Sequence, residues 1–345
     1  MREMDLRTRT LRAELLDLLE IHDASRTVAS LKGTFVMKNV RGGCYVYFQH
    51  YVAGGHCEKL YVGKKDEKVE KLMRDHAEDK ADTREMRRIL RRLSAQVSAG
   101  TEVPADKPTM RIIRDVSDAG VFRAGGVLLG VHAFRAIGMM LGVVWSDVMA
   151  GQDTNKSTQQ SISVAVPMIK TDTPRTLDSL TMGFFPVPAL DRKHPSTTFT
   201  VRGTRIRLDL FTPGTRGSSA PIPIPRFKCV ALPSNYLSYL IASPDRAVLV
   251  DAEPVLGNIP QPVRYAFYNL LVSQDRPHSA ETIENLRQAH QILSLVTAVR
   301  PHDIGQAWRH LVRRRPKWRS PVERGIARLR QLFGELNLGD LLDDT

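Results

Sequence analysis

The first hundred residues show three successive patterns of hydrophobic and polar positions. Leucines at 11, 15, 18 and 19 have the spacing of an amphipathic helix over residues 6–22. Residues 33–50 and 59–63 are rich in Thr, Val, Tyr and Phe, with glycine pairs at 42–43 and 54–55, and this predicts a small antiparallel sheet. Residues 67–98 then mix acidic and basic side chains at helical intervals, which predicts a charged helix that ends at Gly100.

The pattern changes after a predicted linker at residues 101–108. We expect a short helix at residues 111–120, a brief apolar strand at 125–129, a helix at 131–142 and a buried strand at 161–166. Residues 198–211 alternate as a strand, but Gly203 and Thr204 interrupt the alternation and predict a hairpin turn. Helical spacing returns at residues 261–272 and 279–299, and the acidic residues 335–345 are expected to fray.

The composition is that of a globular protein of two or three domains. The chain has 345 residues, of which 42% are hydrophobic and 25% charged. Its longest apolar stretches are far too short to span a membrane, and the charged residues 1–21 have no apolar signal-peptide centre, so we expect a cytoplasmic protein. The three cysteines, Cys44, Cys57 and Cys229, are too few for a disulfide framework.

A formal net charge of +13 favours polyanionic partners such as nucleic acid or triphosphates. Residues 309–330 hold nine Lys or Arg against one Glu and include Trp318. Such a run is typical of a solvated helical face, but basic residues interleaved with tryptophan also suit a phosphate backbone. The candidate contacts in this run are Arg313, Arg314, Arg315, Lys317 and Arg319.

A glycine corner is the first candidate for chemistry. The apolar strand at residues 125–129 runs into Gly130 and then directly into the predicted helix. Because the first N–H groups of a helix are unpaired, such a corner can face an anion, and glycine removes the side chain that would block it. Gly130, Val131 and His132 are therefore candidate phosphate-binding residues, although corners of this kind also occur without ligands.

Three distant oxygen-bearing side chains form the second candidate. In a strand, Asp153 and Asn155 would point to the same face, and Asp209 on a neighbouring strand could complete a site for one ion. Mg²⁺ takes oxygen ligands and often binds one or two carboxylates together with substrate phosphates. The alternative is that Asp153 sits in a polar loop and Asp209 near a strand end, with no metal between them.

Several phrases of this sequence resemble a group of bacterial proteins with a nucleotidyltransferase-like domain, in the polymerase-beta-type superfamily. The most specific phrase runs from residue 119 to 145 and contains the glycine corner. Weaker matches are Lys32-Gly33-Thr34-Phe35 with Tyr45 to Tyr47, Tyr61-Val62-Gly63, residues 151–156, Asp209 to Pro213, and residues 264–271 with Arg276.

The resemblance implies an α+β fold in which helices flank a mixed β-sheet. Residues 1–100 would form the small antiparallel sheet with its helices, 109–276 the nucleotidyltransferase-like domain, and 279–345 a helical basic region. It also implies Mg²⁺-dependent transfer of a nucleoside monophosphate from an NTP to an RNA or protein hydroxyl. Asp153, Asn155 and Asp209 would be the metal-binding and catalytic residues, and one carboxylate would assist deprotonation of the acceptor.

Four positions depart from the family pattern. The family's Gly-Thr is Gly130-Val131 here, its Asp-x-Asp is Asp153-Thr154-Asn155, and its His-Lys pair is Tyr268-Asn269. The substitutions remove a hydroxyl, a carboxylate and a cation while the scaffold phrases remain. The sequence therefore predicts a weakened metal site, and it leaves a second hypothesis open: an inactive scaffold that binds nucleic acid or a protein partner through the basic C-terminal run and the N-terminal sheet.

Overall fold

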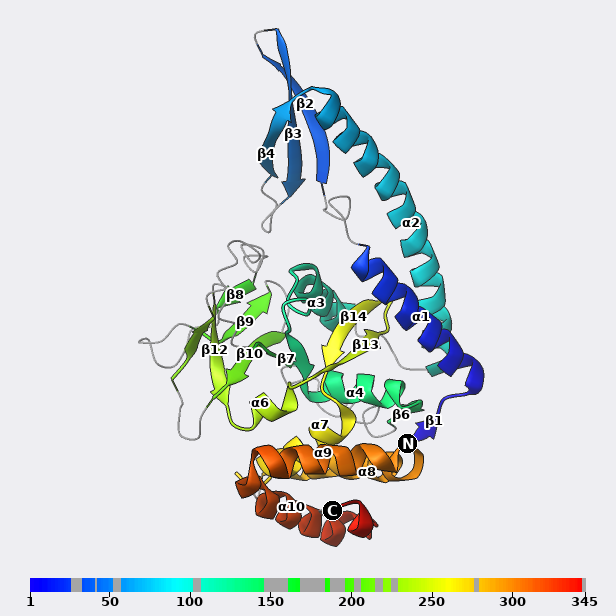
Figure 1. The fold of residues 1–345 in the computed structure, drawn as a ribbon, viewed down its shortest axis with the longest axis vertical. Helices are drawn as coiled ribbons and strands as arrows, with labels where there is room; N and C mark the ends of the chain where they lie inside the picture. Colours follow the sequence, from blue (N-terminus) through cyan, green and yellow to red (C-terminus); the bar gives the residue numbers. More distant parts are fainter. Residues whose placement is uncertain are drawn as a thin grey trace.

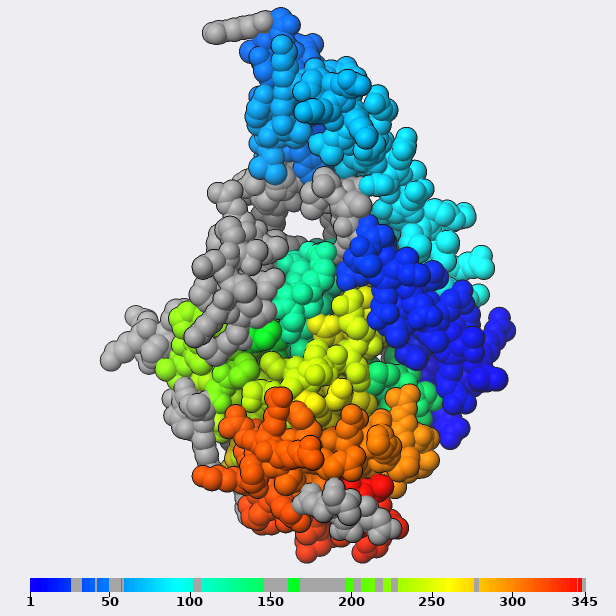
Figure 2. All heavy atoms as spheres, in the orientation of Figure 1, coloured from blue at the N-terminus to red at the C-terminus, as the bar shows by residue number. Residues whose placement is uncertain are grey.

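The computed structural model describes residues 1–25, 33–40, 42–51, 57–101, 107–145, 161–167, 184–186, 196–201, 206–214, 220–224, 229–275 and 279–342. Figure 1 shows a body built around a mixed sheet, a layer of C-terminal helices below it and an N-terminal arm that rises above it. The arm projects well beyond the body in the space-filling view (Figure 2). None of the helices in the described ranges combines the length and the apolar character needed to cross a membrane.

The central sheet has seven strands of mixed direction, as expected for the α+β fold. β7, β10 and β12 run parallel, whereas β5, β9 and β11 run antiparallel to their neighbours. β12 pairs with the second half of β10, and β9 pairs with the first half of the same edge. The strands are β5 (Val127–Leu129), β7 (Ser161–Ala165), β8 (Phe184–Pro186), β9 (Thr198–Val201), β10 (Arg207–Pro213), β11 (Ile222–Ile224) and β12 (Cys229–Ser234).

The predicted strand pair at residues 198–211 is confirmed as β9 and β10, although its Gly203-Thr204 turn lies outside the described residues. Two predictions made from the sequence are wrong. Lys107 and Pro108 belong to helix α3 and not to a linker, because proline is tolerated in the first turn of a helix. The C-terminal segment does not fray throughout, since Leu336 and Leu338 are buried against the body.

Helices enclose the sheet in one continuous hydrophobic core that extends from Ile112 to Leu338. Trp308, Phe134 and Phe267 are among its largest fully buried side chains. The helices around this core are α3 (Lys107–Asp118), α4 (Gly130–Met140), α6 (Leu237–Leu240), α7 (Pro262–Val272), α8 (Ala280–Val299), α9 (Pro301–Arg314) and α10 (Arg319–Phe333).

The arm consists of a three-stranded sheet carried between two helices. Its elements are α1 (Leu6–Ala24), β2 (Gly33–Val40), β3 (Gly43–Tyr51), β4 (Cys57–Lys64) and α2 (Glu67–Thr101). The predicted antiparallel sheet is confirmed, with strand order β2-β3-β4. At 1.5 Å per residue, the 35 residues of α2 span about 50 Å, so the sheet is held far from the base of the arm.

A hairpin that the sequence analysis did not predict joins the arm to the body. It consists of β13 (Asp245–Leu249) and β14 (Val255–Ile259). On one side Val248 and Leu256 pack in a second core cluster with leucines of α1 and α2, and on the other Ala247 and Leu249 belong to the main core. At the turn of this hairpin, the buried Asp251 accepts a hydrogen bond from Arg114 at 2.8 Å.

The glycine corner between β5 and α4 is supported from within the core by Tyr265 of α7. The Tyr265 hydroxyl lies 3.2 Å from the carbonyl oxygen of Gly130 and 2.8 Å from Oε1 of Gln288. The Tyr265 ring stacks on Phe134 of α4 with centroids 6.3 Å apart, and Phe134 stacks in turn on Trp145. Burial raises the pKa of the Tyr265 hydroxyl, so it stays a neutral donor at physiological pH.

We expect Tyr265→Phe to lower the free energy of unfolding by about 1 to 3 kcal/mol, because Gln288 and Gly130 lose a buried hydrogen-bond donor. The parent protein should also lose stability as the pH rises above the ordinary tyrosine pKa of 10.0. Above that pH the unfolded tyrosine ionises while the buried one does not, and proton release then favours unfolding. Urea unfolding across pH 7 to about 11 tests this; an alkaline loss as large in the variant as in the parent would contradict it.

Candidate nucleotide-binding site

The glycine corner has the geometry that the sequence predicts. β5 is buried, and α4 begins at Gly130, whose φ of +65° lies in the left-handed region that favours glycine. A Cβ at this position would meet nothing within 4 Å, so the backbone conformation, and not crowding, requires glycine. The N-cap residue of α4, Leu129, makes no side-chain capping hydrogen bond, and Gly130 and Val131 are exposed while His132 is half-buried. The first N–H groups of α4 are therefore oriented to meet an anion.

Asp209 lies at the same end of the sheet as this corner. In β10, Asp209 is paired with Ser163 of β7, and Ser163 is paired in turn with Leu129, the residue before Gly130. Neighbouring strands are about 4.8 Å apart, so the backbones at Asp209 and Leu129 are separated by roughly 10 Å. Residues that are directly paired point to the same face of a sheet, and Asp209, Ser163 and Leu129 therefore share one face.

The carboxylate of Asp209 is oriented by a threonine from β9. Thr198 is the residue paired with Asp209, and its hydroxyl donates a hydrogen bond to Oδ1 of Asp209 at 2.7 Å. Within the described part of the chain, the other oxygen, Oδ2, has no hydrogen-bond partner. Asp209 is half-buried, and Thr198 holds its side chain in one orientation.

Arg207 places a positive charge on the same face. It precedes Asp209 by two residues in β10, and the burial of β10 alternates so that Arg207 and Asp209 lie on the half-exposed side and Leu208 and Leu210 on the buried side. Nε of Arg207 is buried and has no hydrogen-bond partner among the described residues. Hydroxyl side chains surround the two charged residues on this face: Ser161, Ser163, Thr198 and Thr200.

Two of the predicted site residues fall outside the described residues: Asp153 and Asn155. Their approach to Asp209 is therefore still a prediction. Among the residues that are described, no three His, Cys, Asp or Glu side chains gather in a way that could hold a metal ion. Asp209 is the only predicted metal ligand in those ranges.

Position 269, one of the positions expected to depart from the family pattern, lies in the core close to Tyr265. Asn269 is only 3% exposed and is a neighbour of Tyr265. Its neighbour Tyr268 is also largely enclosed, and burial raises the pKa of its hydroxyl, while a hydrogen bond with Ser234 acts in the opposite direction. Tyr268 and Asn269 therefore belong to the packing of α7, and the positive charge nearest to Asp209 along the same strand is that of Arg207.

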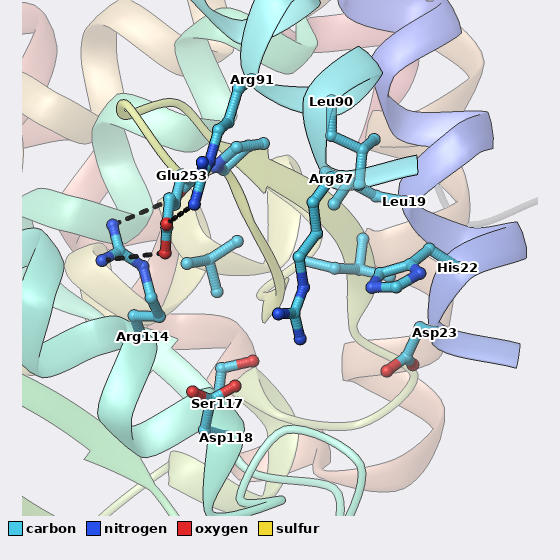
Figure 3. Close-up of a pocket in the computed structure, with 13 residues that line it drawn as sticks. Leu19, His22, Asp23, Arg87, Leu90, Arg91, Arg114, Ser117, Asp118 and Glu253 are labelled. Atoms are coloured by element: carbon cyan, nitrogen blue, oxygen red, sulfur yellow. Dashed lines mark hydrogen bonds and ion pairs between the residues drawn. The ribbon is translucent and has the colours of Figure 1, made fainter. Parts of the chain in front are cut away.

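A cavity of about 130 Å³ lies elsewhere, where the arm meets the body (Figure 3). Its walls come from α1, α2, α3 and the start of β14, and none of the predicted site residues lines it. Glu253 forms ion pairs with Arg91 of α2 and with Arg114 of α3, the latter at 3.4 Å. Arg91, Glu253 and Arg114 thus connect the arm to the body, and we assign this cavity to the joint.

The five predicted nucleic-acid contacts lie at the corner between α9 and α10, and all five are exposed: Arg313, Arg314, Arg315, Lys317 and Arg319. The guanidinium carbon of Arg315 lies 5.4 Å from the ring centroid of Trp318. Arg319 forms an ion pair with Glu323 at 3.0 Å, which offsets part of its charge. We call these five residues the basic corner.

The sequence analysis missed Thr198, Arg207 and Tyr265. Alternation along the strand at residues 206–211 would have placed Arg207 beside Asp209, because residues two apart in a strand share a face. No comparable signal exists for Thr198 or Tyr265. Their contacts with Asp209 and Gly130 depend on the pairing of β9 with β10 and on the position of α7 against α4.

Comparison with known proteins identifies the family of the chain. A family profile described as Nucleotidyltransferase matches residues 107–313, which is more than half of the chain and runs from the start of α3 into the last turn of α9. No curated protein and no solved structure matches the chain. The matched range contains the glycine corner, β7 and β10. The chain belongs to the nucleotidyltransferase family.

Proposed function

We propose that this protein transfers a nucleoside monophosphate from an NTP to a hydroxyl group of RNA or of a protein, in a Mg²⁺-dependent reaction at the glycine corner. The observation that carries the proposal is the pairing of β10, β7 and β5. It places the only described candidate metal ligand, Asp209, two strands from the N-terminus of α4. Family membership supplies the reaction class.

Phosphate binding would use the backbone more than side chains. The first N–H groups of α4, at Gly130, Val131 and His132, would bind phosphate oxygens of the NTP, and the positive end of the helix dipole would favour their charge. Arg207 would add a side-chain cation on the Asp209 face.

The oxygen donors fit a magnesium ion. Oδ2 of Asp209 has no partner among the described residues, Asp153 would add a second carboxylate, and Asn155 would add a neutral carbonyl oxygen. When bound, Mg²⁺ would offset the charge of the triphosphate. Because Asn155 carries no charge, this site binds the ion more weakly than one with three carboxylates.

In the transfer step, the acceptor hydroxyl oxygen forms a bond to the α-phosphorus. The bond between that phosphorus and the oxygen bridging to the β-phosphate breaks, and pyrophosphate leaves. Asp209 would accept the hydroxyl proton, and Thr198 would hold it in the orientation for doing so. The N–H groups at the corner would stabilise the charge that develops on the phosphates.

The second candidate is a scaffold that has lost catalysis and binds nucleic acid or a protein partner. The exposure of all five side chains of the basic corner favours nucleic acid for this alternative, because exposed arginines next to a tryptophan suit a phosphate backbone.

We expect Asp209→Asn to weaken NTP binding in the presence of Mg²⁺ by about 10- to 100-fold, because it removes a charged ligand and keeps the shape that accepts the hydrogen bond from Thr198. Isothermal titration with ATP, CTP, GTP and UTP, each with and without Mg²⁺, measures this. Asp82→Asn on the exposed surface of α2 is the matched control and should bind like the parent. If no NTP binds the parent in a Mg²⁺-dependent way, the enzyme proposal fails.

Asn155→Asp restores the carboxylate of the family pattern and should raise nucleotide transfer by about tenfold or more, because the metal site gains a negative charge. Incorporation of label from an α-³²P NTP into the protein itself and into added RNA gives the rate. Asn269→Lys is a useful comparison, since position 269 is buried below the corner and lysine there should not raise transfer. A variant no faster than the parent would remove the argument that Asn155 limits the reaction.

For the scaffold alternative, replacing Arg313, Arg314 and Arg315 together by glutamine should reduce the salt dependence of binding to a DNA duplex by about 0.9 per contacting arginine. Fluorescence anisotropy between about 50 and 200 mM salt gives the slope. An unchanged slope would show that the basic corner does not contact the phosphates.

A further inference from the structure

The arm sheet has two faces of different character. In β3, Val46 and Phe48 are buried and point to the face that packs on α2, where Phe35 and Phe48 contact His76 in edge-to-face geometry with centroids 5.1 and 5.8 Å from the His76 ring. Because side chains alternate along a strand, Tyr45 and Tyr47 point to the opposite face. α2 therefore covers one face only.

Three tyrosines gather on the opposite face, which we call the tyrosine face. Tyr47 is paired with Tyr61 of β4, and their ring centroids are 5.5 Å apart. Tyr45 lies next to them, 6.4 Å from the centroid of Tyr61. Tyr61 is 60% exposed, so it presents its ring to solvent from the edge strand β4.

Every charged residue that the strand register assigns to the tyrosine face is a lysine: Lys38, Lys59 and Lys64. Lys38 is opposite Tyr45 and holds its ammonium group 5.5 Å from the ring centroid of Tyr47. Among the described residues, none of the three forms an ion pair, whereas the adjacent Lys65 is paired with Glu70 of α2 at 3.2 Å. Within the described ranges, the positive charge of this face therefore lacks an acidic partner.

Cross-strand aromatic pairs also stabilise sheets, and this accounts for the contact between Tyr47 and Tyr61. Cross-strand pairing explains neither why Tyr61 is exposed nor why every charged residue on the tyrosine face is a lysine. Nor does the position of the sheet suggest a structural role, since α2 carries it about 50 Å from the base of the arm and Figure 2 shows it projecting beyond the body.

We propose that the tyrosine face binds single-stranded RNA. Bases would stack on Tyr47 and Tyr61, whose rings accept any base, and Lys38, Lys59 and Lys64 would contact the phosphates on either side. Thr34 and Gln49 are paired on the same face and offer hydrogen-bonding groups to ribose 2′-hydroxyls, which selects RNA over DNA. The proposal does not depend on nucleotide transfer, because the tyrosine face shares no residue with the glycine corner.

Anisotropy of a labelled oligouridylate of about 12 nucleotides, with the full-length protein and no Mg²⁺ or NTP, tests the proposal. Tyr61→Ala should weaken binding by about 5- to 100-fold, and Tyr61→Phe should keep it, because the ring face remains. Tyr61 is exposed, so Tyr61→Ala should fold; circular dichroism verifies this. Lys38→Gln and Lys59→Gln should each reduce the salt slope by about 0.7, whereas Lys71→Gln, an exposed lysine of α2, should leave it unchanged.

Equal affinity of Tyr61→Ala and parent would overturn the proposal, as would a duplex RNA that binds as tightly as the single strand. Oligothymidylate that binds as well as oligouridylate would overturn the choice of RNA. If the oligouridylate does not bind, the face is not an RNA site and a protein partner becomes the better hypothesis. These outcomes are separate from failure of the proposed transfer, which is measured by Mg²⁺-dependent NTP titration at the glycine corner.

Discussion

The position of β7 between β5 and β10 is the constraint on which the candidate site depends. β7 runs antiparallel to β5 and parallel to β10, so the carboxyl end of β5 and the amino-terminal half of β10 meet at the same end of the sheet. That arrangement brings Gly130 and Asp209 together although 79 positions separate them in the sequence numbering. A slip of one residue in the pairing of β10 with β7 would turn Asp209 to the buried face, where an unpaired carboxylate is strongly unfavourable.

Contacts from the core and from the neighbouring strand β9 also hold the site in place. Tyr265, stacked on Phe134, contacts the carbonyl oxygen of Gly130 from the core, and Thr198 fixes one oxygen of Asp209 from β9. These contacts position groups without adding charge to the site.

The hairpin of β13 and β14 attaches the projecting arm to the body. One side of the hairpin packs in the main core and the other in the cluster formed with α1 and α2. Ion pairs among Arg91, Arg114 and Glu253 surround the joint (Figure 3). The chain therefore combines two surfaces of different chemistry. One is the glycine corner, where backbone N–H groups begin a helix, and the other is a sheet with aromatic and basic side chains at the end of a long helix.

Local sequence determined most of the elements. Hydrophobic spacing predicted α1, α4, α7 and α8, the intervals of charged residues predicted α2, and β-prone composition with glycine turns predicted the arm sheet, because these signals are properties of consecutive residues. The glycine corner was predictable for the same reason, since the strand, Gly130 and the helix follow one another directly. The hairpin at residues 245–259 was missed, because both of its faces are buried and no alternation marks it. Only tertiary structure decided that Thr198 and Tyr265 contact the site and that Tyr61 lies exposed beside Tyr47, because strand pairing and helix packing join residues that the sequence separates.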